Sequence, residues 1–165
     1  MKKGFDFIAK QEGSASILSE IEKETNFSFP PVFKDFVARF GISSDNLVIE
    51  TERDELRGFE FPVEAVVYPL QDGDSSYLYF SEFRDLEAIG EDIKLLSQDS
   101  VWEEMGLIAI DYSTVGEKVC LGVRGEKRDQ IWRLNEDSIP ENRYTFLAED
   151  IVGFVEGFIS KRAYL

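Results

Sequence analysis

No histidine occurs among the 165 residues of this chain, and cysteine occurs once, at Cys120. Without histidine, Ser-His and Cys-His nucleophilic mechanisms and His-ligated zinc sites are excluded, together with the usual proton shuttle at neutral pH. A single cysteine forms neither an internal disulfide nor a Cys-rich zinc site. The sequence therefore predicts a protein with no cofactor and no resident metal, and most hydrolase templates are ruled out.

Long apolar runs and glycine-rich phosphate loops are also missing. No segment approaches the roughly 20 apolar residues that a membrane-spanning helix needs. Near the N-terminus, Asp6, Lys10 and Glu12 interrupt any apolar stretch before a signal-peptide core forms. No glycine pattern matches a P-loop or a dinucleotide-binding fingerprint. We expect a cytoplasmic protein without membrane contact, and a reducing compartment agrees with the lone Cys120.

Bulky apolar residues and acidic residues are abundant. Hydrophobic residues make up 43% of the chain and include 14 phenylalanines, enough to build the core of one domain over residues 1–165. Acidic side chains number 33 against 18 basic ones, for a net charge of −15. A field of that sign repels nucleic acid and anionic membranes and attracts basic proteins. A basic protein partner is one reading of this charge, and a surface that simply keeps the protein in solution is the other.

Helical periodicity is clear in four segments. Residues 15–25 place three aliphatic residues on one stripe and charges on the other side. Pro30 and Pro31 precede an aromatic stripe that ends at Gly41, as expected for a helix with proline in its first turn and a glycine C-cap. Residues 84–98 and the segment from Ile151 to Ile159 have the same spacing, and a short helical turn is expected over 101–105.

Between these helices, short runs of β-branched and aromatic residues predict strands. They are separated by glycine, proline and aspartate clusters, and they cover residues 47–50, 63–68, 77–83, 107–112, 119–124 and 130–134. The arrangement predicts an α+β fold: an antiparallel β-sheet of about five to six strands, with helices packed mainly on one side. Trp132 lies in one of these strands, where packing is the more common role of an aromatic residue and ligand contact the alternative.

Carboxylate pairs are the remaining route to catalysis, because glycosidase chemistry needs only two acids. Acidic residues are too frequent here to single out such a pair, and the doublets Glu91–Asp92 and Glu103–Glu104 are typical of solvated helix surfaces. Asp72 and Asp74 offer oxygen atoms, but their segment lacks the spacing and the distal glutamate of a calcium loop. We therefore predict that the chain is not an enzyme, and an unrecognised carboxylate enzyme stays as a minor alternative.

Acidic loops and one tryptophan are the candidate contacts with a protein partner. Trp102 stands in a polar stretch beside two glutamates, and an exposed tryptophan is a common anchor at protein interfaces, although packing under a short helix is the alternative. The least periodic part of the chain carries further acids in an expected loop, which is either functional or merely solvated. The candidates chosen on acidity, expected exposure and loop placement are Asp45, Glu50, Glu52, Asp54, Glu55, Asp72, Asp74, Trp102, Glu103 and Glu104.

The order of these elements resembles the SMI1/KNR4-like (SUKH) superfamily. The helix at Ile17–Glu24, the Phe29-Pro30 step and the aromatic helix ending at Gly41 are similar to the first part of that family's pattern. The Ile-Ala strand from Leu107 to Ile110, the Gly116–Glu117 turn with the strand after it, Gln130-Ile131-Trp132 and a closing helix with Phe154 and Phe158 resemble the rest. The family-like turn adds Gly116 and Glu117 to the candidate contacts.

The resemblance implies a function in protein binding. Members of this superfamily are bacterial immunity proteins against polymorphic toxins and, in fungi, regulators of cell-wall synthesis. The leading hypothesis is an immunity protein that neutralises a cognate toxin by direct binding, with a basic nuclease as one candidate target because of the net charge of −15. A regulatory or scaffold protein of cell-wall synthesis or signalling is the alternative.

Overall fold

The computed structural model describes residues 14–42, 51–54, 59–62, 66–70, 77–80, 83–96, 106–111, 116–136, 138 and 143–160. It has the predicted α+β fold, with antiparallel strands. The helices within the described residues are α1 (Ser14–Thr25), α2 (Pro31–Phe40), α3 (Leu86–Leu96), α5 (Ile151–Glu156) and the 3-10 helix η1 (Gly125–Lys127).

The strands form three antiparallel groups in the described part of the chain. Strands β1 (Thr51–Asp54) and β2 (Phe59–Pro62) pair with each other. Strands β3 (Val66–Pro69), β4 (Tyr77–Phe80) and β9 (Ile159–Ser160) pair in the order β4-β3-β9. The largest group has the order β5-β6-β7-β8 and consists of β5 (Leu107–Ala109), β6 (Glu117–Gly122), β7 (Ile131–Asn135) and β8 (Tyr144–Ala148).

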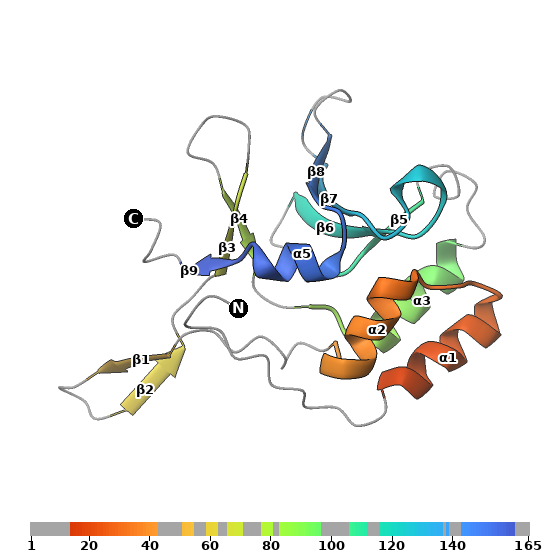
Figure 1. Ribbon diagram of the computed structural model, residues 1–165, viewed down its shortest axis with the longest axis horizontal. Helices are drawn as coiled ribbons and strands as arrows, with labels where there is room; N and C mark the ends of the chain where they lie inside the picture. The colour runs from red at the N-terminus through yellow and green to blue at the C-terminus, as the bar shows by residue number, and fades with distance from the viewer. Residues whose placement is uncertain are drawn as a thin grey trace.

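The helices gather on one side of the four-stranded sheet. Figure 1 shows α1, α2 and α3 grouped below this sheet, with α5 between them and the β4-β3-β9 group. The β1–β2 hairpin lies apart from both larger sheets (Figure 1). Because the helices cover one face of the four-stranded sheet, that face carries the main core.

Helix α2 forms as its sequence predicts. Pro31 starts the helix, and the Gly41 N–H closes it by donating to the Val37 carbonyl at 2.8 Å, with φ at 69°. Glycine adopts this positive φ without steric cost, so the chain turns sharply at the end of the helix. Phe33, Phe36 and Val37 are buried, as their spacing on one stripe predicts.

Helices α1 and α3 pack closely because α3 carries a glycine at their contact. A Cβ atom at Gly90 would lie 2.9 Å from Ile21 Cγ1, closer than normal van der Waals contact. Gly90 lowers the intrinsic helix propensity of α3 by about 1 kcal/mol. The close packing of Ile21 against α3, which a larger residue at this position would prevent, explains why a glycine is found here. Ile89 and Ile93 on the same helix are buried in the core.

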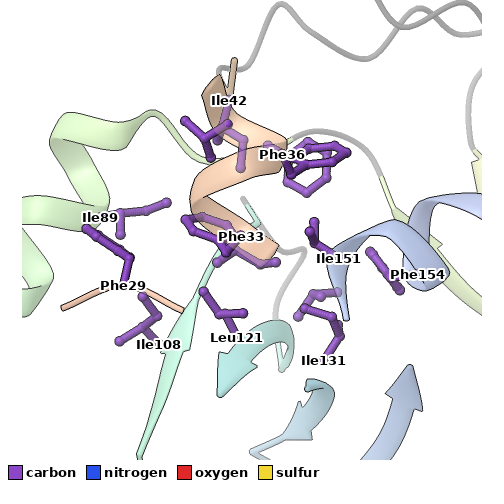
Figure 2. Packing of buried hydrophobic residues seen from close by; sticks show 14 of the residues in the cluster. Phe29, Phe33, Phe36, Ile42, Ile89, Ile108, Leu121, Ile131, Ile151 and Phe154 are labelled. Atoms are coloured by element: carbon purple, nitrogen blue, oxygen red, sulfur yellow. The ribbon is translucent and has the colours of Figure 1, made fainter. Parts of the chain in front are cut away.

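The core consists of aromatic and aliphatic side chains from the helices and the two larger sheets. Figure 2 shows Phe33 of α2 above Leu121 and Ile131 of the sheet, with Ile151 and Phe154 of α5 beside them. The phenylalanines that are essentially inaccessible to solvent are Phe29, Phe33, Phe80, Phe83 and Phe154. Each such ring buries roughly 150–250 Å² of surface, so these residues dominate the hydrophobic stabilisation.

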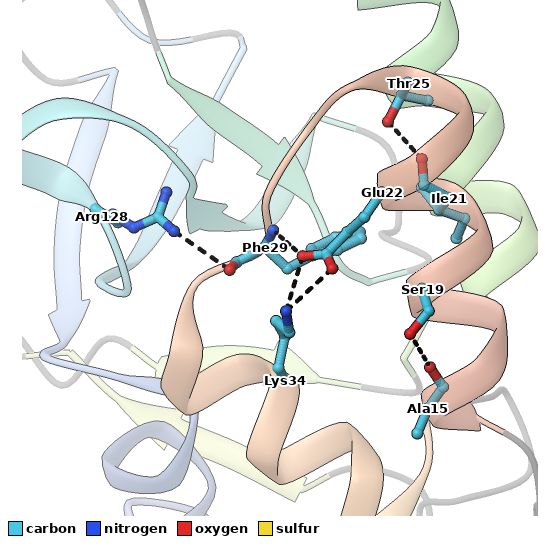
Figure 3. A network of polar contacts seen from close by, with 8 residues as sticks. All are labelled: Ala15, Ser19, Ile21, Glu22, Thr25, Phe29, Lys34 and Arg128. Carbon is cyan, nitrogen blue, oxygen red and sulfur yellow. Dashed lines mark hydrogen bonds and ion pairs between the residues drawn. The ribbon is translucent and has the colours of Figure 1, made fainter.

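A polar network fixes the chain between α1 and α2 (Figure 3). The Glu22 carboxylate accepts hydrogen bonds from the Phe29 N–H at 2.8 Å and from Lys34 Nζ at 3.0 Å. On the other side, Arg128 Nη2 donates to the Phe29 carbonyl at 3.2 Å. Phe29 is thereby held in the core from both sides, and the helical layer is joined to the β6–β7 connection.

The closing helix is shorter than the sequence predicts. Helix α5 ends at Glu156, and Ile159–Ser160 pair with Val66–Val67 as strand β9. The expected continuation of the helix through Ile159 is therefore wrong. Phe158 is buried in either arrangement, so its apolar spacing did not distinguish a helix from a turn followed by a strand.

Further differences concern strands. Residues 51–54, expected in a loop, form β1, and neither β2 at residues 59–62 nor β8 at residues 144–148 was predicted. The strands expected at 63–68, 77–83, 107–112, 119–124 and 130–134 correspond to β3 to β7 with shifted ends. The expected strand at 47–50 and turn at 101–105 lie outside the described residues.

Candidate partner-binding surface

Most of the acidic candidates lie where the structure gives no description. Glu52 and Asp54 belong to β1, opposite Phe61 and Phe59 of β2, and only their backbone is described. The candidates outside the described residues are Asp45, Glu50, Glu55, Asp72, Asp74, Trp102, Glu103 and Glu104. Their role in partner contact stays a prediction.

The Gly116–Glu117 turn is described and opens β6. Gly116 has a φ of 92°, a conformation that favours glycine, and its carbonyl accepts from the Glu136 N–H at 2.8 Å. The Glu117 carboxylate forms an ion pair with Arg133 of β7. This turn therefore joins the start of β6 to the end of β7. The Glu117 carboxylate already has a cationic partner, Arg133, within the chain.

The face of the four-stranded sheet that points away from α1, α2 and α3 has an apolar cluster of its own. Side chains alternate along a strand, so the residues next to the core residues Val119, Leu121 and Ile131 point to the opposite face. Leu107, Cys120 and Leu134 are buried there, with Ala109, Trp132 and Tyr144 packed against them. We call this side, with Phe146 and Lys127 added, the outer sheet face.

Aromatic rings dominate one end of the outer sheet face. Trp132 and Phe146 are register partners on β7 and β8, and their rings meet edge to face at 5.6 Å and 77°. Phe146 is 43% exposed. The outer sheet face is therefore partly open at this end.

A lysine lies over the rings of Trp132 and Tyr144. Lys127 Nζ of η1 lies 5.2 Å from the centroid of the Trp132 ring and 5.2 Å from that of the Tyr144 ring. Both distances are within the range of a cation–π interaction. Trp132 Nε1 is buried and has no hydrogen-bond acceptor among the residues that the structure describes. Sequence spacing did not reveal this grouping, because strand register and the β6–β7 connection bring the three residues together.

Two buried ionisable groups lie in the same sheet. Burial raises the pKa of the Cys120 thiol to about 12, helped by the nearby Asp111 charge, so this thiol is protonated and unreactive at neutral pH. Burial also raises the pKa of Asp111 to about 7, although the hydrogen bond from Val119 and the charge of Arg84 oppose the shift. Asp111 was not predicted as a notable residue, because it follows an apolar strand without any motif.

The described residues contain no grouping of three or more acidic or cysteine side chains that is placed to bind a metal ion. Within the same part of the chain, no helix has the length and apolar character that crossing a membrane requires. The described side chains of the outer sheet face offer exposed ring surface, a cation and paired charges.

Comparison with known proteins identifies the family. The model of the SMI1/KNR4 family (SUKH-1) matches residues 13–157, which is most of the chain. Searches of curated proteins and of solved structures gave no significant match. The match covers α1 through α5 and includes all of the family-like residues named from the sequence except Phe158, which lies one residue beyond its end. The chain therefore belongs to the SMI1/KNR4 family (SUKH-1).

Proposed function

We propose that this protein is an immunity protein that neutralises a cognate toxin by binding it directly. The observation that carries the proposal is the family match over residues 13–157, because domains of this family are known to bind cognate toxins. The family supports an immunity-type domain in general, and the outer sheet face, with Phe146 exposed on it, offers aromatic surface for such contact.

The proposed target is a basic toxin, for example a nuclease. A chain with a net charge of −15 steers a basic protein into contact and accelerates association. Acidic side chains of an inhibitor can also take the positions of substrate phosphates on a nuclease. The acidic residues between 45 and 55, 72 and 74, and 103 and 104 are the proposed source of this attraction.

We propose that inhibition is by occupancy and not by chemistry on the toxin. Members of the family are generally non-catalytic. The chain lacks histidine, and its only thiol is buried with a pKa of about 12. Asp111 is the one buried acidic residue in the described part of the chain, and its carboxylate is used by the Val119 N–H. These features support a binding protein whose effect depends on the surface it covers.

The experiment that tests this function is co-expression with the products of the neighbouring reading frames. The expected result is that one neighbour stops growth when expressed alone, that this chain restores growth, and that the two proteins co-purify. Release of the complex as salt rises would support a contact with a basic toxin. Co-purification with cell-wall or signalling components, without protection from any neighbour, would favour the regulatory alternative and overturn the proposal.

A further inference from the structure

We propose that the rings of Trp132 and Tyr144 on the outer sheet face bind an arginine or lysine side chain of a basic partner protein. In the free protein, Lys127 occupies that position. The inference rests on the proposed function for the basic character of the partner, and it adds the surface and the chemistry of the contact.

The geometry around Lys127 shows that the two rings form a cation site. Its Nζ lies 5.2 Å from each ring centroid, inside the distance of about 6 Å at which a ring attracts a cation. The edge-to-face contact between Trp132 and Phe146 holds the tryptophan ring in place. Two rings that share one ammonium group are arranged to hold a cation, whichever chain supplies it.

Lys127 can leave this position without a change in the fold. Its backbone is fixed in the β6–β7 connection, where its carbonyl accepts from the Gln130 N–H at 3.0 Å. Its side chain has four rotatable bonds and is half-buried. An incoming guanidinium is planar and weakly hydrated, and it stacks on aromatic rings better than an ammonium does. A partner arginine therefore stacks on the rings more strongly than the lysine does, and it competes against the higher effective concentration that Lys127 has as part of the same chain.

The neighbouring surface also suits a basic partner. Glu126 and Glu149 are exposed near the start of β7, where Gln130 Nε2 donates to Glu149 at 3.3 Å. Lys118 is paired with Glu136 at 2.7 Å, so its charge is offset within the chain. The Arg143 charge acts on Tyr144 from the same strand region. The overall charge of −15 outweighs this local cation and favours the approach of a basic partner.

In the opposite arrangement, Lys127 itself would contact a carboxylate of the partner. The two arrangements predict opposite effects of one substitution. Lys127→Met keeps the alkyl stem and the backbone and removes the cation. If the rings bind a cation from the partner, this change removes a competitor and strengthens binding. If Lys127 binds a carboxylate, the same change weakens binding.

The test is a titration of the ¹⁵N-labelled protein with Ac-Gly-Arg-Gly-NH2, followed by NMR at the Trp132 indole Nε1–H signal. The citrulline peptide is the neutral isosteric control, and the glutamate peptide tests the opposite charge. Two indole signals are present because the chain has two tryptophans, and Trp102→Phe identifies the Trp132 signal. Binding through the rings predicts a saturable shift with arginine and none with citrulline or glutamate.

Three variants test whether Lys127 competes with the peptide for the rings. Lys127→Met is expected to bind the arginine peptide about two- to fivefold more tightly, the range of one exposed cation–π contact. Phe146→Ala is expected to weaken binding, and Leu95→Ala, at a 64% exposed position on α3, is expected to leave it unchanged. An unmoved Trp132 signal, an equal response to citrulline or weaker binding by Lys127→Met would overturn the inference. None of these measurements uses a toxin, so a failure of this inference is distinguishable from a failure of the proposed immunity function.

Discussion

The Asp111 carboxylate accepts a hydrogen bond from the backbone N–H of Val119, with 2.8 Å between Oδ1 and N. It does so at the point where β5 leaves β6. The Ile110 N–H still donates to the Val119 carbonyl at 2.9 Å, but the Ile110 carbonyl accepts from the Arg84 N–H instead. The Asp111 carboxylate therefore accepts from the Val119 N–H in place of the Ile110 carbonyl, which is used by Arg84.

This arrangement predicts a pH-dependent stability. Burial raises the pKa of Asp111 from 3.8 in the unfolded chain to about 7. The folded protein thus binds a proton more tightly, so this contribution to stability is fully present below about pH 4 and is lost as the pH rises through about 7. Asp111→Asn keeps the acceptor and removes the titration.

We expect Asp111→Asn to be more stable than the wild type at pH 8 by about 1–3 kcal/mol, and the two proteins to converge toward pH 4. Urea unfolding at several pH values measures this difference. The half-buried Asp150→Asn is a control for a carboxylate loss elsewhere. Parallel stability profiles for the wild type and Asp111→Asn would show that Asp111 does not titrate in this range.

The backbone that carries Lys127 depends on a glycine in β6. A Cβ atom at Gly122 would lie 1.7 Å from the Lys127 carbonyl oxygen, so Gly122→Ala forces the β6–β7 connection to move. We expect a loss of about 3 kcal/mol in the free energy of unfolding. Gly125→Ala is the matched control, because Gly125 has a φ of 60° but open space around it, and its expected cost is about 1 kcal/mol.

Chemical denaturation of both variants makes the comparison. A larger loss for Gly125→Ala than for Gly122→Ala would contradict the close approach of the two backbone segments. The NMR signal of the Trp132 indole provides a second measurement, since movement of Lys127 away from its ring changes the environment of that indole.

The Glu22 network predicts a difference between two substitutions at one position. Glu22→Gln keeps an acceptor for the Phe29 N–H and loses the ion pair with Lys34, whose side chain is 42% exposed. We expect a cost of about 0.5 kcal/mol for this change. Glu22→Ala also leaves the Phe29 N–H without its acceptor, for an expected cost of about 1–2 kcal/mol. Thermal unfolding of both variants tests whether Glu22→Ala is the less stable one. Lys34→Met, which removes only the ion pair, is the control.

Long-range charge should govern how fast the toxin binds. We expect the association rate to fall by tenfold or more as ionic strength rises from about 0.01 M to 0.5 M, because screening shortens the reach of the acidic field. Glu103→Lys with Glu104→Lys should slow binding more than Glu20→Lys with Glu156→Lys, although both pairs change the net charge equally. Equal effects would place the proposed contact away from residues 103 and 104.

The sequence predicted those elements whose local pattern and packing agree. Helix α2 has a proline start, a glycine end and one apolar stripe, and each signal refers to the same ten residues. The α+β class followed from the order of helices and short strands. Family resemblance was recognisable for the same reason, since it depends on that order.

Elements that depend on distant partners were not predictable. β9 exists because Ile159 and Ser160 meet Val67 and Val66, and nothing near Ile159 in the sequence encodes that pairing. β8 was missed, although its Tyr144 and Phe146 face Leu134 and Trp132 across the sheet. Short strands are fixed by their neighbours more than by their own propensity.

The candidate surface was predictable only in part. Acidity indicated a basic partner, and the family pattern pointed to the Gly116–Glu117 turn. The aromatic end of the outer sheet face depends on the β7–β8 register and on where η1 places Lys127, which spacing alone does not encode. Trp132 was assigned mainly to packing, and its half-buried ring does pack against the apolar cluster of that face.

The most direct test of the proposed function is isothermal titration of the purified protein with the toxin encoded beside its gene, paired with a growth assay. Wild-type protein and Leu95→Ala should bind and protect equally, whereas Phe146→Ala, at a 43% exposed position on the outer sheet face, should bind the toxin more weakly and protect less. Phe146→Ala that binds and protects like the wild type would move the contact to another face. Wild-type protein that neither binds nor protects would contradict the immunity function itself.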